Sequence, residues 1–233
     1  MNRIAFLWDD LLSILFPRVC HACGDHLVRN ENIICTACHV AIPKTGFHLE
    51  RDNYAEKLFW GRCRIERAAA WAYYTKGGRM TRLIYRFKYN GIREIGSELG
   101  RIYGIDLCES GFMDDIDFLV PVPLHPGKER KRGFNQSMVL ANAISVVSNK
   151  PVIGLALVRV TKTGTQTIRS RIERWRNVEG IFETGDCQML EDKHILLVDD
   201  VITTGSTIDA CVTALSVVPG IRVSVIAMAV AAL

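Results

Sequence analysis

The chain has 233 residues, a hydrophobic content of 48% and a charged content of 23%, which is typical of one globular domain with an appendage. No apolar run reaches the roughly 18 residues that a spanning helix needs, so we expect no membrane span. The net charge of +4 is uneven, because residues 126–176 hold 11 Lys and Arg against two acids. This basic segment is either a solvated face or a surface that meets phosphates or nucleic acid.

The N-terminus is expected to form an amphipathic helix. Ile4, Leu7, Leu11, Leu12 and Leu15 recur at helical spacing. Two acids interrupt this apolar stretch and no small-residue cleavage site follows, which argues against a signal peptide. A helix on a membrane surface is the alternative. Without a secretory signal, eight cysteines indicate a reducing compartment, so we expect a cytoplasmic protein.

Four cysteines come next, with the spacing C-x2-C-x11-C-x2-C: Cys20, Cys23, Cys35 and Cys38. Each C-x2-C pair can direct two thiolates at one ion, and two pairs complete a tetrahedron. We therefore expect a structural zinc site, with four protein ligands and no open position for catalysis. Two disulfides or plain core cysteines are the alternative, which a reducing compartment disfavours.

The rest of the chain alternates between strand and helix patterns. Apolar runs predict strands within residues 62–75, 116–124, 155–160, 194–200 and 222–231. Helical periodicity appears over residues 79–91, 92–110, 134–149 and 206–218. This alternation predicts an α/β fold, with a mostly parallel sheet covered by helices on both faces. We expect an N-terminal helix and zinc finger over 1–45 and the α/β domain over 46–233.

Ligands of such sheets bind at the carboxyl ends of the strands, where HILLVDDVITTGST (residues 194–207) places an unusual turn. The strand is expected to end near Val198, with Asp199 and Asp200 at its edge. The turn that follows has small and hydroxyl side chains: Thr203, Thr204, Gly205, Ser206 and Thr207. Its N–H groups at a helix N-terminus favour an anion, whereas the two acids suit a sugar diol and Mg²⁺. A simple helix cap is the alternative.

ILLVDDVITTGST resembles the phosphoribosyl pyrophosphate (PRPP) loop of type I phosphoribosyltransferases. Three further segments and the cysteine pattern extend the resemblance over nearly the whole chain: FKYNGIRE, PVPLHPGKERKRGFNQ and RVTKTGTQTIRSRIERWRNVEGIF. This ordered set is similar to the ComF/GntX family, which implies a type I phosphoribosyltransferase-like fold. One departure is the Asp-Asp pair, where many members of the superfamily have one Glu and one Asp.

The resemblance implies particular site residues. Asp199 and Asp200 would contact the ribose hydroxyls and act in catalysis. The following residues would cradle the 5′-phosphate: Val201, Thr203, Thr204, Gly205, Ser206 and Thr207. The loop of Pro121, Val122 and Pro123 would hold pyrophosphate with Mg²⁺, and residues 161–176 would close over the site. Candidate donors to the departing pyrophosphate are Arg130, Arg132, Lys162, Arg169 and Arg171, although each could equally be a solvated charge.

Two functions follow from the resemblance. The first is a Mg²⁺-dependent phosphoribosyltransferase (a pentosyl transferase) that displaces pyrophosphate at the anomeric carbon by an unidentified nitrogen acceptor. The second is a non-catalytic factor that handles single-stranded DNA in DNA uptake during competence and retains a PRPP-binding fold. DNA, and the DNA-uptake machinery, would then be its partners. The basic segment and the cysteine pattern suit the second function, and no base-binding pocket is evident in the sequence.

Overall fold

A computed structural model describes residues 18–160, 181–185 and 187–231. The N-terminal helix predicted over the first 15 residues lies outside this range. So do the expected closing segment (residues 161–176) and its candidate donors Lys162, Arg169 and Arg171.

The centre of the protein is a four-stranded parallel sheet in the order β1-β6-β5-β2. Its strands are β1 (Ala68–Tyr74), β2 (Phe118–Pro121), β5 (His194–Ile202) and β6 (Arg222–Ala231). All three neighbouring pairs run parallel. The α/β class with a parallel sheet is therefore confirmed.

Helices cover both faces of this sheet, as predicted. β5 and β6 are buried along nearly their whole lengths, and successive side chains of a strand point to opposite faces. The connection from β1 to β2 crosses the sheet in one direction through α4 (Arg79–Tyr89) and α5 (Arg93–Glu109). The connection from β5 to β6 runs back the other way through α9 (Ser206–Leu215). Since such crossovers are right-handed, α9 lies on the opposite face from α4 and α5.

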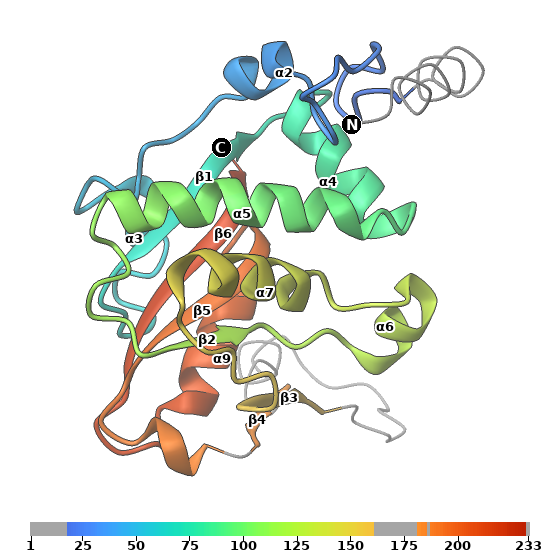
Figure 1. Cartoon of the computed structure of the whole chain (residues 1–233). Coiled ribbons are helices and arrows are strands. Elements are labelled where there is room, and N and C mark those ends of the chain that lie inside the picture. Colours follow the sequence, from blue (N-terminus) through green and yellow to red (C-terminus); the bar gives the residue numbers. More distant parts are fainter. Residues whose placement is uncertain (1–17, 161–180, 186, 232–233) are drawn as a thin grey trace.

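The helix α7 (Gln136–Ser148) packs beside α5, as Figure 1 shows. Their close approach depends on glycines of α5. A Cβ on Gly100 would lie 2.8 Å from the Cβ of Ala143 and 3.1 Å from the carbonyl oxygen of Leu140. On α4 the buried residues are the four apolar ones expected from the periodicity: Met80, Leu83, Ile84 and Phe87.

Shorter elements complete the fold: α2 (Thr36–Ala41), α3 (Tyr54–Lys57), α6 (Pro126–Arg132), β3 (Leu157–Arg159), β4 (Phe182–Thr184) and the 3₁₀ helix η1 (Gln188–Leu190). β3 and β4 form a separate antiparallel pair, which the sequence did not predict. Within the described residues, none of the helices combines the length and apolar character required to cross a bilayer.

The outer strands of the sheet each pair with a short neighbouring segment. Lys44 forms an antiparallel bridge with Ala72 of β1, and Val152 forms a parallel bridge with Leu119 of β2. The peptide that leads from the cysteines to the α/β domain therefore runs along the β1 edge of the sheet.

The strand β5 is longer than expected. The prediction that it ends near Val198 is wrong, because Asp199, Val201 and Ile202 pair with residues of β6. β6 continues as a ten-residue strand, so it provides hydrogen-bonding partners beyond Val198. The two acids therefore lie in the C-terminal part of strand β5 and not in the loop that follows it.

Candidate ligand pocket and cysteine cluster

A cavity of about 350 Å³ opens at the carboxyl ends of β2 and β5. Five separate segments of the chain line it: the end of β1, α4, residues 122–137 from the end of β2 to the start of α7, β3, and the end of β5 with the turn that follows. Asp199 and Asp200 lie in its wall. The location agrees with the general position of ligand sites in parallel sheets.

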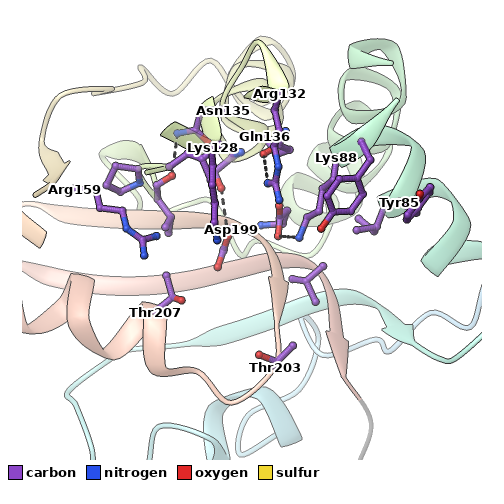
Figure 2. Close-up of a pocket in the computed structure, with 18 of the residues that line it drawn as sticks. Tyr85, Lys88, Lys128, Arg132, Asn135, Gln136, Arg159, Asp199, Thr203 and Thr207 are labelled. Carbon is purple, nitrogen blue, oxygen red and sulfur yellow. Dashed lines mark hydrogen bonds and ion pairs between the residues drawn. The ribbon is translucent and has the colours of Figure 1, made fainter. Parts of the chain in front are cut away.

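The two acids have different partners. Asp200 is 9% exposed, and its Oδ1 forms an ion pair with Lys88 Nζ of α4 at 2.7 Å. Asp199 Oδ1 accepts hydrogen bonds from Ser137 Oγ at 3.3 Å and from the backbone N–H of Asp200 at 2.8 Å. Figure 2 shows Lys88 on the α4 side of the pocket and Asp199 nearer its centre.

Burial raises the pKa of the Asp199 carboxyl to about 7, and the nearby charge of Asp200 acts in the same direction. The Asp200 N–H, Lys88 and Ser137 lower this pKa but do not offset burial. Near neutral pH the protonated and ionised forms of Asp199 are therefore both populated. A cation or a hydroxyl donor that enters the pocket would favour the ionised form.

The β5–α9 turn places Gly205 at the N-cap of α9 with φ of +78°. Glycine is required here for two reasons. The backbone is left-handed, and a Cβ would lie 2.8 Å from Cε1 of Phe59. Gly205 has no side chain to cap α9, and the Ser206 N–H makes only a long contact of 3.5 Å with Thr204 Oγ1, so the N-terminus of this helix can receive an anion. Thr204 Oγ1 and Ser206 Oγ lie 2.9 Å apart in the same turn.

A segment after α3 supports this turn from outside the cavity. Arg62 Nη1 donates to the carbonyl oxygen of Thr204 at 2.6 Å, and Arg62 also pairs with Asp209 of α9. The turn is therefore held at the Thr204 carbonyl and at the first turn of α9.

The structure brings most of the predicted pocket residues together. Those that line the cavity are Val122, Pro123, Arg132, Asp199, Asp200, Val201, Thr203 and Thr207. Thr204, Gly205 and Ser206 belong to the same turn but do not line the cavity. Pro121 ends β2 just before the lining residues, and Arg130 is exposed on α6.

Sequence reasoning missed several lining residues: Tyr74, Tyr85, Lys88, Tyr89, Lys128, Asn135, Gln136, Ser137 and Arg159. One signal was present. The FKYNGIRE segment places Lys88 on α4 beside buried Phe87, so a charge lies next to the core face of a helix. Nothing in the sequence indicated that α4 faces the acids.

The four cysteines form a compact cluster, as the spacing predicted. Their sulfur atoms all lie within 4.8 Å of one another, and Sγ of Cys23 is 3.8 Å from Sγ of Cys35. Four sulfurs at about 2.3 Å from a zinc ion would be separated by about 3.8 Å in a tetrahedron. No disulfide joins these cysteines.

Backbone N–H groups point at the sulfurs. Cys20 Sγ accepts from Ala22 and Cys35, and Cys35 Sγ accepts from Cys38, at 3.3–3.4 Å. Such donors stabilise thiolates, so the donor set fits a metal ion such as zinc. The ligand atoms of His21, His26 and His39 do not belong to the group.

The cysteine cluster packs against α4. Arg82 Nη1 donates to the carbonyl oxygen of Ala22 at 3.2 Å, and Arg86 Nη1 lies 3.3 Å from His21 Nδ1. The same helix carries Lys88 into the pocket. The predicted boundary between residues 1–45 and 46–233 stays a prediction, and α4 contacts both sides of it.

No family model matches the chain. It is 30% identical over 203 residues to the competence protein ComFC of Bacillus subtilis, covering 84% of this chain and 78% of the relative. It is 27% identical to the DNA utilization protein YhgH of Escherichia coli K12 over 82% of this chain and 80% of the relative. The competence protein F of Haemophilus influenzae is also 27% identical, over 82% and 87%.

The solved structures that it resembles include a glutamine PRPP amidotransferase from B. subtilis, with 20% identity and a TM-score of 0.38 over 56% of this chain and 25% of that one. The adenine phosphoribosyltransferase of Saccharomyces cerevisiae gives 12% identity and a TM-score of 0.36, over 60% and 71%. The sequence relationship to ComFC, which spans most of both chains, assigns the family: the chain belongs to the ComF family of competence proteins.

Proposed function

We propose that this protein binds PRPP together with Mg²⁺ and transfers the phosphoribosyl group to a nitrogen nucleophile. One observation carries the proposal: a pair of acids, Asp199 half-buried and Asp200 buried, and a helix N-terminus without a side-chain cap at Gly205 follow each other in one chain segment beside a single cavity. A ligand with a diol and a phosphate a few ångströms apart would satisfy both features.

Each part of PRPP has a counterpart in the pocket. The β5–α9 turn would receive the 5′-phosphate on its N–H groups. Asp199 and Asp200 would accept hydrogen bonds from the ribose hydroxyls. The pyrophosphate would lie near two cations that line the cavity, Lys128 and Arg159. These charges would stabilise the leaving group as the bond to the anomeric carbon breaks. Lys162 and Arg171 stay predictions for the same role.

The pair of carboxylates also fits Mg²⁺, which prefers oxygen ligands and keeps part of its water shell. Bound there with PRPP, the ion would neutralise pyrophosphate charge. Lys88 already neutralises Asp200, whereas Asp199 forms no ion pair with a lysine or arginine among the described residues. Ionisation of Asp199 would thus accompany ligand binding.

Titration calorimetry with PRPP and Mg²⁺ tests the proposal, followed by an assay for pyrophosphate release. We expect binding at or below millimolar PRPP that weakens when Mg²⁺ is removed. The proposal fails if neither PRPP nor ribose 5-phosphate binds at millimolar concentration, because the turn is then only a helix cap.

A second candidate function is the handling of single-stranded DNA during DNA uptake. The relatives carry names such as competence protein and DNA utilization protein. The supporting observation is the helix α6, which exposes Lys128, Arg130 and Lys131, and Lys128 also lines the cavity. This surface suits a phosphate backbone, and the two functions are compatible.

A further inference from the structure

We infer that Tyr85 and Tyr89 of α4 form a stacking surface for a planar nitrogenous base at the end of the pocket. This inference rests on the proposed function, and it names the chemical class of the acceptor: a heterocyclic base, taken either free or as part of a single strand.

The two tyrosines are exposed although they lie in the wall of a cavity. Tyr85 is 58% exposed and Tyr89 is 60% exposed, and both line the pocket that holds the acids. They are four residues apart on one helix, so their side chains lie on the same face. Their ring centroids are 5.0 Å apart with a tilt of 44°. Large aromatic rings left open beside a polar pocket are suited to stacking.

An arginine borders this surface. The guanidinium carbon of Arg132 lies 5.1 Å from the ring centroid of Tyr89, and Arg132 Nη1 donates to Gln136 Oε1 at 2.9 Å. Gln136 is 2% exposed, so a buried side chain fixes the position of the Arg132 guanidinium. A planar guanidinium beside aromatic rings adds a second surface on which a base can stack.

The two tyrosines lie where an acceptor base could reach a sugar bound at the acids. Lys88, which lies between the two tyrosines in sequence, reaches Asp200, so the tyrosines belong to the helix that touches the proposed ribose site. In Figure 2, Tyr85 and Lys88 lie at one end of the pocket and Arg159 at the other, with Asp199 between them. A base on the tyrosines would therefore sit on the opposite side of the sugar site from Arg159.

Nucleoside monophosphates are the appropriate probes, since they carry a ribose 5-phosphate and a base. We expect AMP and UMP to bind the full-length protein more tightly than ribose 5-phosphate does in calorimetry. In Tyr85→Leu/Tyr89→Leu this advantage should fall by roughly 5- to 100-fold, the range of base–aromatic stacking, while ribose 5-phosphate binds as before. Tyr85→Phe/Tyr89→Phe should retain the advantage, because the rings remain.

A matched control is Trp60→Leu, which removes an aromatic ring that is 59% exposed and does not line this cavity; it should retain the advantage. Thermal unfolding checks that the leucine variant is folded. An oligonucleotide of thymidines, measured by anisotropy, distinguishes the source of the base. If Tyr85→Leu/Tyr89→Leu weakens binding of the oligonucleotide alone, the tyrosines bind bases of a single strand. If it weakens binding of AMP and UMP, the tyrosines bind the acceptor base.

Two failures are distinguishable. If ribose 5-phosphate and PRPP do not bind the wild-type protein, the proposed function fails. If they bind, and the leucine variant binds AMP, UMP and the oligonucleotide as the wild type does, the stacking surface is overturned and the proposed function stands.

Discussion

The cysteine cluster and the ligand pocket contact the same helix, α4, but they are built in opposite ways. All four cysteines come from one short segment, Cys20–Cys38, and their sulfurs face inward toward one point. The pocket takes its lining from five separate segments between Tyr74 and Thr207. The first arrangement is closed and suits a structural ion. The second is open and keeps acids and cations within reach of a ligand.

This difference shows how far each region depends on the rest of the fold. A cluster of close neighbours needs only a local turn and a metal ion, whereas the pocket exists only when the sheet, α4 and α7 are assembled. The contacts of Arg82 and Arg86 with the cysteine segment join the two regions through α4. Loss of the first region should therefore affect the second.

The largest effect is expected for Cys23→Ser. A structural zinc site contributes on the order of 10 kcal/mol of apparent binding free energy, so removing a ligand should release the ion and unfold the segment. Metal analysis of protein purified without added zinc should find about one zinc per wild-type chain and much less in the variant. Limited proteolysis should cut first near the cysteines.

Cys187→Ser is the matched control, since this half-buried cysteine lies outside the cluster. If the wild-type protein contains no metal, the cluster is not a zinc site. If Cys23→Ser loses its zinc and binds PRPP as before, the two regions are independent and α4 does not couple them.

The second effect separates the two functional parts of the pocket. Thr204→Val removes a hydroxyl from the β5–α9 turn, and loss of a hydrogen bond to a charged group costs about 1.5–3 kcal/mol. It should weaken both PRPP and ribose 5-phosphate. Asp200→Asn should weaken PRPP but leave sulfate binding equal or stronger, because a repelling charge is removed. Calorimetry with all three ligands measures this difference in sign, and equal losses for PRPP and sulfate in Asp200→Asn would contradict the roles assigned.

The third effect is the pH dependence of stability caused by Asp199. Its folded-state pKa is raised from 3.8 to about 7, so the folded protein binds this proton more tightly than the unfolded chain. The stability that Asp199 contributes is present below pH 3.8 and is lost as pH rises through about 7. Asp199→Asn should therefore gain on the order of 2 kcal/mol over the wild type between pH 5 and pH 8.

Urea unfolding at the two pH values tests this expectation. Asp114→Asn, at an exposed position, is the control and should show no such gain. A stability difference between wild type and Asp199→Asn that does not change with pH would show that Asp199 is ionised throughout.

The smallest effect concerns DNA. The double variant Arg130→Glu/Lys131→Glu reverses two exposed charges of α6 and should weaken single-stranded DNA a few-fold. It should also reduce the dependence of binding on salt, because fewer counterions are released. Anisotropy with an oligonucleotide at several salt concentrations measures both. Unchanged affinity and salt dependence would place DNA binding on another surface.

The sequence predicted the features that depend on near neighbours. The cysteine spacing, the buried face of α4 and the turn around Gly205 each involve residues close together in the chain, and each appears in the structure. The length of β5 was underestimated, because Asp199 and Val201 are held in the ladder by β6. Their partners in β6, such as Ala227 and Ala229, lie nearly thirty residues further along the chain. The pattern of apolar residues around Asp199 therefore does not show that this pairing exists.

The same limit explains the incomplete pocket. Asp199 and Asp200 could be assigned from their own segment, while Lys88, Tyr85 and Tyr89 come from a helix more than a hundred residues earlier. Only the packing of α4 shows that Lys88 neutralises Asp200. The β3–β4 pair was missed for another reason. β3 falls within the strand predicted over residues 155–160, but β4 has only three residues and is too short to show an alternation.

The short bridges at Lys44 and Val152 affect how the protein can associate with other chains. An exposed outer strand presents unpaired N–H and C=O groups, which can recruit a strand from another protein and start aggregation. Here Lys44 is bridged to Ala72 of β1, and Val152 to Leu119 of β2. Part of each margin is thus occupied by the protein's own backbone, which disfavours growth of the sheet by intermolecular strand addition. A partner that approaches either of these two margins would therefore meet side chains and not a free strand edge.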